Sequence, residues 1–65
     1  MTSRPATIRA IRHARGLRII DVAIDAGLSD STVRKAEAGG NVELATLEAI
    51  AGVLGVPVAR LVEDR

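Results

Sequence analysis

The stretch DVAIDAGLSDSTVRKAEAG, residues 21–39, has the pattern of two short helices joined by a tight turn. Gly27 stands between them, where a left-handed backbone is easiest for glycine. Leu28 follows as an apolar residue that we expect to pack inside the turn, and Ser29 is a good N-cap for the second helix. The stretch therefore predicts two helices joined by a three-residue turn.

Glycines divide the rest of the chain as well, since Gly16, the pair at 39–40 and Gly55 each end a helical pattern. We expect Thr2 or Ser3 to cap the first helix. The apolar residues of the fourth helix recur at spacings of three and four, which is typical of a helix. The sequence predicts an all-α fold of five short helices, at residues 5–15, 19–26, 30–38, 44–54 and 57–62.

The composition narrows the class of protein. A chain of 65 residues predicts one domain, and the lack of Phe, Trp and Tyr requires a core of Leu, Ile, Val and Ala. Without cysteine we expect neither a disulfide nor a thiolate metal site, and the lone His13 predicts no metal or other cofactor. No apolar run approaches the roughly 20 residues of a membrane span, which suits a cytoplasmic protein.

Charge is distributed unevenly along the chain. The first 18 residues hold five arginines and no acidic residue, whereas the later segments 19–40 and 41–65 are each net negative. Such a basic N-terminal third is either a solvated helix surface or a surface that faces an anion, and the lack of interleaved acidic residues favours the second interpretation. No phosphate loop, metal cluster or nucleophile partner for His13 is evident, so we do not expect an enzyme.

Taken in order, the motifs resemble the lambda repressor/Cro-like family of helix-turn-helix domains, also called the xenobiotic-response-element type. IRAIRHARGL is similar to its first helix, DVAIDAGLSDSTVRKAEAG to its helix-turn-helix, and NVELATLEAIAGVLGVPVARL to its last two helices. The resemblance covers about residues 6–63. It implies a lambda-repressor-like fold and a sequence-specific regulator, acting as a repressor, that binds operator DNA.

In repressor-type domains the second helix of the motif enters the major groove with its N-terminal residues near the base edges. The resemblance therefore implies a set of base-contacting candidates on the segment 30–38. Arg34 could donate two hydrogen bonds to guanine, whereas a lysine is better suited to a phosphate. Asp30 either accepts from a cytosine amine or serves the helix dipole. The candidates are Asp30, Ser31, Thr32, Arg34 and Lys35.

Phosphate contacts of this family cluster at the end of the third helix and at the N-termini of the second and fourth helices, and helix N-termini offer free N–H groups to phosphates. By this resemblance the candidates at such places are Arg18, Gly40 and Asn41, and Arg4 or Arg9 could add charge. Because few basic residues lie near the motif, we expect a homodimer on a palindromic site. Four apolar residues near the C-terminus are candidates for the dimer interface: Val56, Val58, Leu61 and Val62. For Val56 and Leu61 the alternative is a place in the core.

The family commonly joins an arginine late in its first helix to a glutamate at the end of its third. Arg12 and Glu37 match those positions here. Glu37 is expected near the core side of its helix, where a bare carboxylate would be costly. We therefore hypothesise a partly buried ion pair between Arg12 and Glu37.

The second helix departs from the family pattern at its start. Arg18, Ile19 and Ile20 replace a small capping residue, a phosphate-contacting Gln and an acidic residue. On a helical wheel Ile19 falls in the buried stripe, whereas Ile20 and Ile24 form a second apolar ridge. This ridge could fill space left by small core residues, or it could bind a protein partner. The alternative function is therefore an antitoxin-type or other protein-interaction module.

Overall fold

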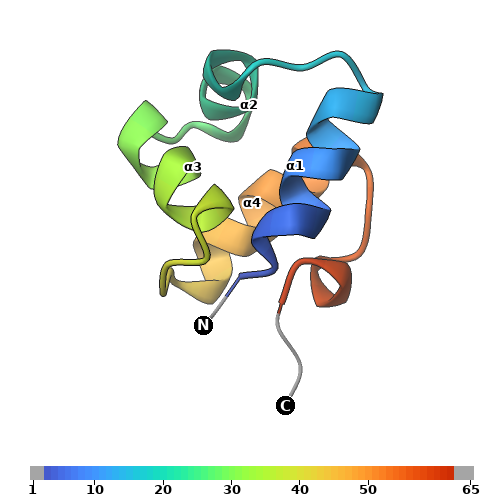
Figure 1. Cartoon of the computed structure of the whole chain (residues 1–65). Coiled ribbons are helices and arrows are strands. Elements are labelled where there is room, and N and C mark those ends of the chain that lie inside the picture. Colours follow the sequence, from blue (N-terminus) through green and yellow to red (C-terminus); the bar gives the residue numbers. More distant parts are fainter. Residues whose placement is uncertain (1–2, 63–65) are drawn as a thin grey trace.

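The computed structural model describes residues 3–62 and consists of short helices wrapped around one aliphatic core (Figure 1). The order is α1 (Pro5–Ala14), α2 (Ile19–Ala26), α3 (Asp30–Glu37), α4 (Leu44–Leu54) and the one-turn 3-10 helix η1 (Val58–Arg60). The all-α prediction is confirmed. The fifth helix was predicted too long, because beyond Pro57 the chain makes a single 3-10 turn and then lies beside the N-terminal segment.

The two helices of the motif meet at a turn built as predicted. Gly27 has a φ of 70°, and the Leu28 N–H donates to the Ala23 carbonyl at 2.8 Å, which closes the end of α2. Ser29 is confirmed as the N-cap of α3, since its hydroxyl accepts the Thr32 N–H at 3.2 Å. This compact connection fixes the direction in which α3 leaves α2.

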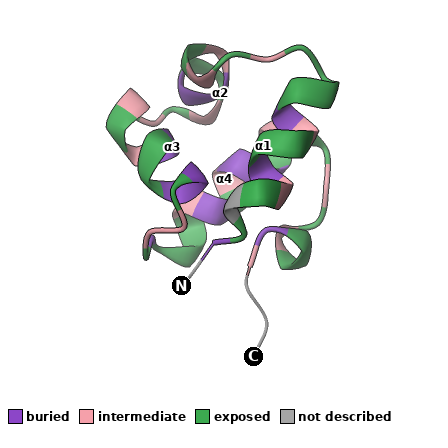
Figure 2. Ribbon diagram, viewed as in Figure 1, coloured by how far each residue is buried: buried purple, intermediate pink, exposed green. Residues whose placement is uncertain are grey.

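The core is made from one stripe of each α-helix, and Figure 2 shows the buried positions facing the middle of the bundle. α2 packs against α4 and α3, α3 also contacts α1, and η1 packs against α4. Leu44, the first residue of the predicted apolar stripe of α4, is exposed instead. The buried apolar residues are Ile8, Val22, Ala23, Val33, Ala36, Val42, Leu47, Ile50, Ala51, Leu54 and Leu61.

The N-terminal segment is tied to the C-terminal segment rather than capping α1. Ser3 and Val62 form an antiparallel bridge, and the Arg4 N–H donates to the Leu61 carbonyl at 2.8 Å. The N-cap position of α1 is Arg4, so the predicted capping role of Ser3 is wrong, and Thr2 lies outside the described residues. Within residues 3–62, no helix has both the length and the apolar character needed to cross a membrane.

Candidate nucleic-acid interface

α3 carries a polar surface on the side opposite its core contacts. Val33 and Ala36 are fully buried, whereas Ser31, Arg34 and Lys35 are exposed. Charged residues suit the helix dipole at both ends, with an acidic residue in the first turn and basic residues in the last. The helix thus presents exposed hydroxyl, guanidinium and ammonium groups from a firmly packed element.

Two of the five base-contact candidates are less accessible than the others. Asp30 and Thr32 are half-buried. The Thr32 hydroxyl lies 2.9 Å from the Ser29 hydroxyl, so it belongs to the cap of α3 as well as to its surface. Asp30 occupies the first turn of α3, where a carboxylate favours the helix dipole.

Arg12 and Glu37 form a buried ion pair that fastens α3 to α1. Arg12 Nη2 donates to Glu37 Oε1 at 2.9 Å, and Arg12 Nε donates to the other carboxylate oxygen. Arg12 Nη1 also donates to the Leu17 carbonyl at 2.9 Å, which extends the network to the loop before α2. Only 8% of Arg12 and 4% of Glu37 is exposed, so the charges are compensated within the fold.

Arg9 adds a weaker contact to the same carboxylate. Its Nε lies 3.4 Å from Glu37 Oε1, and its side chain remains mostly exposed. Arg9 also lines a surface depression of about 470 Å³ with Ala6, Ala10, His13 and Glu37. As a phosphate-contact candidate, Arg9 is therefore accessible but partly engaged.

The loop after α3 contacts both the backbone and the side chain of Lys35. The Gly40 N–H donates to the Lys35 carbonyl at 2.9 Å, and a Cβ on Gly40 would lie 2.6 Å from Lys35 Cγ. The lysine stem therefore packs over Gly40. The backbone N–H of Gly40 is already bonded within the loop, and a contact of Gly40 with a phosphate stays a prediction.

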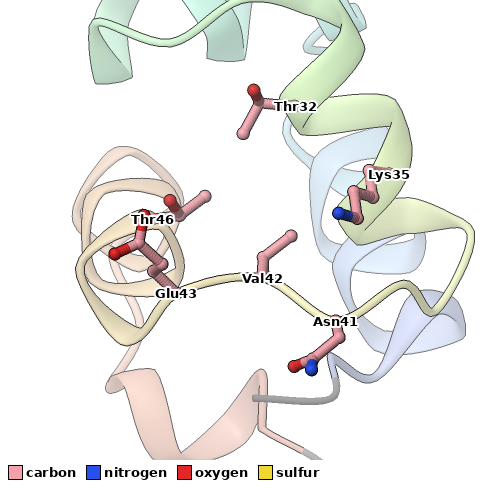
Figure 3. Close-up of a pocket in the computed structure, with 6 residues that line it drawn as sticks. All are labelled: Thr32, Lys35, Asn41, Val42, Glu43 and Thr46. Carbon is pink, nitrogen blue, oxygen red and sulfur yellow. The ribbon is translucent and has the colours of Figure 1, made fainter.

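A depression of about 390 Å³ separates α3 from the start of α4, and Figure 3 shows Thr32 and Lys35 pointing into it from α3. Hydroxyl, amide and ammonium groups are the kinds of donor that meet DNA phosphates. The carboxylate of Glu43 also lines the depression, and its negative charge would repel a phosphate. The lining residues are Thr32, Lys35, Asn41, Val42, Glu43 and Thr46.

The start of α2 contains a second, exposed ion pair. The Arg18 guanidinium donates to the Asp21 carboxylate through Nε at 3.1 Å and through Nη2 at 3.0 Å. The same carboxylate, at the third position of α2, accepts the Arg18 backbone N–H at 2.8 Å, as the acidic residue of a capping box does. Hydrogen bonds from the Arg18 side chain and backbone lower the pKa of Asp21, and the contact with Asp21 raises the pKa of Arg18.

Arg18 and Arg34 line one depression. It measures about 700 Å³, and it lies where the end of α1, the start of α2 and the first turns of α3 meet. Ile19, Ile20 and Asp30 also contribute to its wall. A polyanion bound along α3 would therefore meet the Arg18 guanidinium as well.

A family model described as a helix-turn-helix domain matches residues 6–63, which is nearly the whole chain. The chain belongs to this helix-turn-helix family. The match agrees with the lambda repressor/Cro-like resemblance and supports a DNA-binding regulator in general. No curated protein matches the chain in sequence.

The remaining phosphate candidates of the helix-turn-helix domain differ in their surroundings. Arg4 is exposed, but its Nε donates to the Val62 carbonyl at 2.7 Å. Asn41 is exposed in the loop before α4 and lines the depression beside Lys35. Arg4 is thus tied to the C-terminal segment, whereas Asn41 lies next to the end of α3.

The partner candidates separate into core and surface residues. Leu61 is fully buried and belongs to the core, which is the alternative role that the sequence left open for it. Val56, Val58 and Val62 are half-buried and pack against the core. Of the α2 ridge, by contrast, 44% of Ile20 and 70% of Ile24 is exposed.

Sequence reasoning missed the role of Ser3 in supporting α3. Its side chain is fully buried, and its hydroxyl donates to the carbonyl of Ala36, in the last turn of α3. A longer contact of 3.5 Å joins the same hydroxyl to the Gly40 carbonyl. No local pattern signals a bond between residues 33 positions apart in the chain.

Among residues 3–62, no group of three or more metal-ligating side chains is found.

Proposed function

We propose that this helix-turn-helix domain is a sequence-specific transcriptional regulator that reads an operator in the major groove of DNA through α3. The exposed polar side of α3 carries the proposal, because Ser31 and Arg34 have donors or acceptors that match base edges. The packing of Val33 and Ala36 and the ion pair of Glu37 hold this surface rigidly. Repression would follow from occupancy of the operator and requires no chemical step.

The phosphate contacts are proposed to come from both ends of this surface. Lys35 and Asn41 supply one end, beside the depression before α4. Arg18 supplies the other end, and Arg4 and Arg9 could add charge further along α1. Such contacts position the duplex without reading its sequence.

Selection from random-sequence duplexes tests this function. We expect one preferred sequence to emerge. Replacing Arg34 by Ala should relax the preference at one base pair, by roughly 1–3 kcal/mol, because a bidentate contact to guanine is lost. Lys35→Ala should weaken all duplexes alike. Enrichment of no sequence, despite binding to DNA, would reject the specific regulator.

We also propose that two copies bind one palindromic operator. A single small domain makes few phosphate contacts, and a second copy would double them. Val56, Val58 and Val62 are the half-buried apolar residues that a partner could cover. The mass of the complex on the selected duplex tests this proposal, since a 1:1 complex on an operator without symmetry would contradict it.

One observation favours a second candidate function, binding of a protein partner through α2. Ile20 and Ile24 lie one turn apart on its surface, and both are exposed. Replacing Ile24, which does not line the depression beside Arg18 and Arg34, by Ser should weaken binding to such a partner while leaving duplex binding intact. Loss of duplex binding in that variant, without unfolding, would instead assign the ridge to the DNA surface.

A further inference from the structure

The contact between Arg18 and Asp21 uses only one edge of the guanidinium. A guanidinium has five N–H groups, and the carboxylate accepts one from Nε and one from Nη2. Both N–H groups of Nη1 and the second one of Nη2 remain. Within residues 3–62 no other hydrogen bond is made by this side chain, 78% of which is exposed.

Asp21 is itself held in place. Its Oδ2 accepts the Arg18 backbone N–H at 2.8 Å, so the carboxylate is anchored to the backbone while it holds the guanidinium. Only 29% of the Asp21 side chain is exposed. A fixed carboxylate restricts the rotamers of a long and otherwise mobile side chain. The guanidinium is thus oriented before any ligand arrives.

We propose that Asp21 is a positioning residue: it grips Arg18 by its Nε–Nη2 edge and leaves the Nη1–Nη2 edge to receive a DNA phosphate. This inference rests on the proposed DNA-binding function. The planar fork of arginine can serve a carboxylate and a phosphate on two different edges, which an ammonium group cannot do with the same geometry. Because Arg18 and Arg34 line one depression, a duplex read by Arg34 would pass close to this edge.

Asp21 could instead weaken DNA binding, which would reverse the effect of removing it. A carboxylate next to Arg18 could compete with the phosphate for the guanidinium and repel the duplex. In that case removing it should tighten binding. If it orients Arg18, removing it should weaken binding, because ordering the freed side chain then opposes association.

Affinity for a short labelled duplex of mixed sequence separates these effects, since non-specific binding depends on phosphate contacts. We expect Asp21→Ala to lose roughly twofold to tenfold in affinity, the range set by immobilising one long side chain. In an Arg18→Ala background the same change should have no effect. Arg18→Lys should not restore wild-type affinity. Tighter binding by Asp21→Ala would overturn the inference.

Asp25 provides a matched control, because it is an exposed acidic residue on the same helix without an ion pair among the described residues. Asp25→Ala removes the same charge and should not weaken binding. Asp21→Asn keeps an acceptor for the backbone N–H of residue 18, which guards against unfolding. A capping role alone would persist without the Arg18 side chain, so an equal loss in both backgrounds would also overturn the inference.

The outcomes also separate the two proposals. If the wild-type chain binds duplex DNA but Arg18→Ala binds equally well, the inference about Asp21 fails and the proposed function stands. If the wild-type chain binds no duplex at low salt, both fail.

Discussion

The carboxylate of Glu37 accepts hydrogen bonds from two nitrogens of Arg12, across the contact between α3 and α1. Both residues are nearly inaccessible to solvent, so the pair compensates two charges that would each be costly alone. Glu37 is the last residue of α3, and the outward side of this helix carries the proposed DNA-reading groups. Correct placement of those groups therefore depends on an interaction on the opposite side of the helix.

Replacing Glu37 by Gln should destabilise the domain strongly. The substitution leaves the Arg12 charge buried and uncompensated, which costs about 3–5 kcal/mol. Thermal unfolding followed by circular dichroism measures the loss. Arg9→Ala is the control, because the exposed and longer Arg9 contact should contribute less than about 1 kcal/mol. A melting temperature of Glu37→Gln equal to that of the wild type would reject the pairing as a source of stability.

Gly40→Ala and Gly52→Ala should change stability in opposite directions. A Cβ on Gly40 would lie 2.6 Å from Lys35 Cγ and 2.9 Å from the Lys35 carbonyl oxygen, so backbone must move at a cost of roughly 1–3 kcal/mol. Gly52, inside α4, has open space around its Cβ position, and alanine there should stabilise by about 0.4–1 kcal/mol. Urea unfolding of both variants checks this, and a neutral Gly40→Ala would show that Lys35 is not packed as described.

Ser3→Ala should weaken the end of α3. The buried hydroxyl bond to the Ala36 carbonyl is lost, and a bond of this kind contributes about 0.5–1.5 kcal/mol. Ser31→Ala, on the exposed side of α3, should change stability by less than about 0.5 kcal/mol. Hydrogen exchange at the last turn of α3 should rise in Ser3→Ala only. Equal exchange in both variants would contradict the support of α3 by Ser3.

Acid should remove the contribution of Asp21 to stability. Because the Arg18 hydrogen bonds lower the pKa of Asp21 in the folded state, folding favours the ionised carboxylate. The resulting stability is present above the unfolded pKa of Asp, about 3.9, and is lost as pH falls through the lower folded value. The free energy of unfolding of Asp21→Asn should accordingly depend less steeply on pH in this window than that of Asp25→Asn. Identical pH dependence of the two variants would exclude the linkage.

Most of the fold could be predicted from the sequence, because the signals are local. Glycines end the helices, the apolar spacing marks their buried sides, and Ser29 precedes the N–H groups that it caps. The length of η1 could not be predicted, since Pro57 and apolar residues allow either a helix or a single turn. Its actual form depends on Val62 lying beside Ser3.

The candidate site was less predictable, because its details depend on which donors are already engaged. The Gly40 N–H is engaged locally by the Lys35 carbonyl at the end of α3. The burial of Leu61 follows from packing between segments distant in the chain, which apolar periodicity does not report. The grip of Asp21 on Arg18 spans three residues, yet a first-turn carboxylate usually indicates only a favourable helix dipole. The proposed positioning role of Asp21 rests on the geometry of the guanidinium contact.

The affinity for duplex DNA across a salt series tests whether the polar side of α3 and its flanking residues bind DNA. We expect the logarithm of the association constant to fall linearly with the logarithm of salt concentration, by about 0.9 for each phosphate contact. Lys35→Ala should reduce that slope by about one contact. A wild-type chain that is folded but fails to bind duplex DNA even at low salt would contradict the claim.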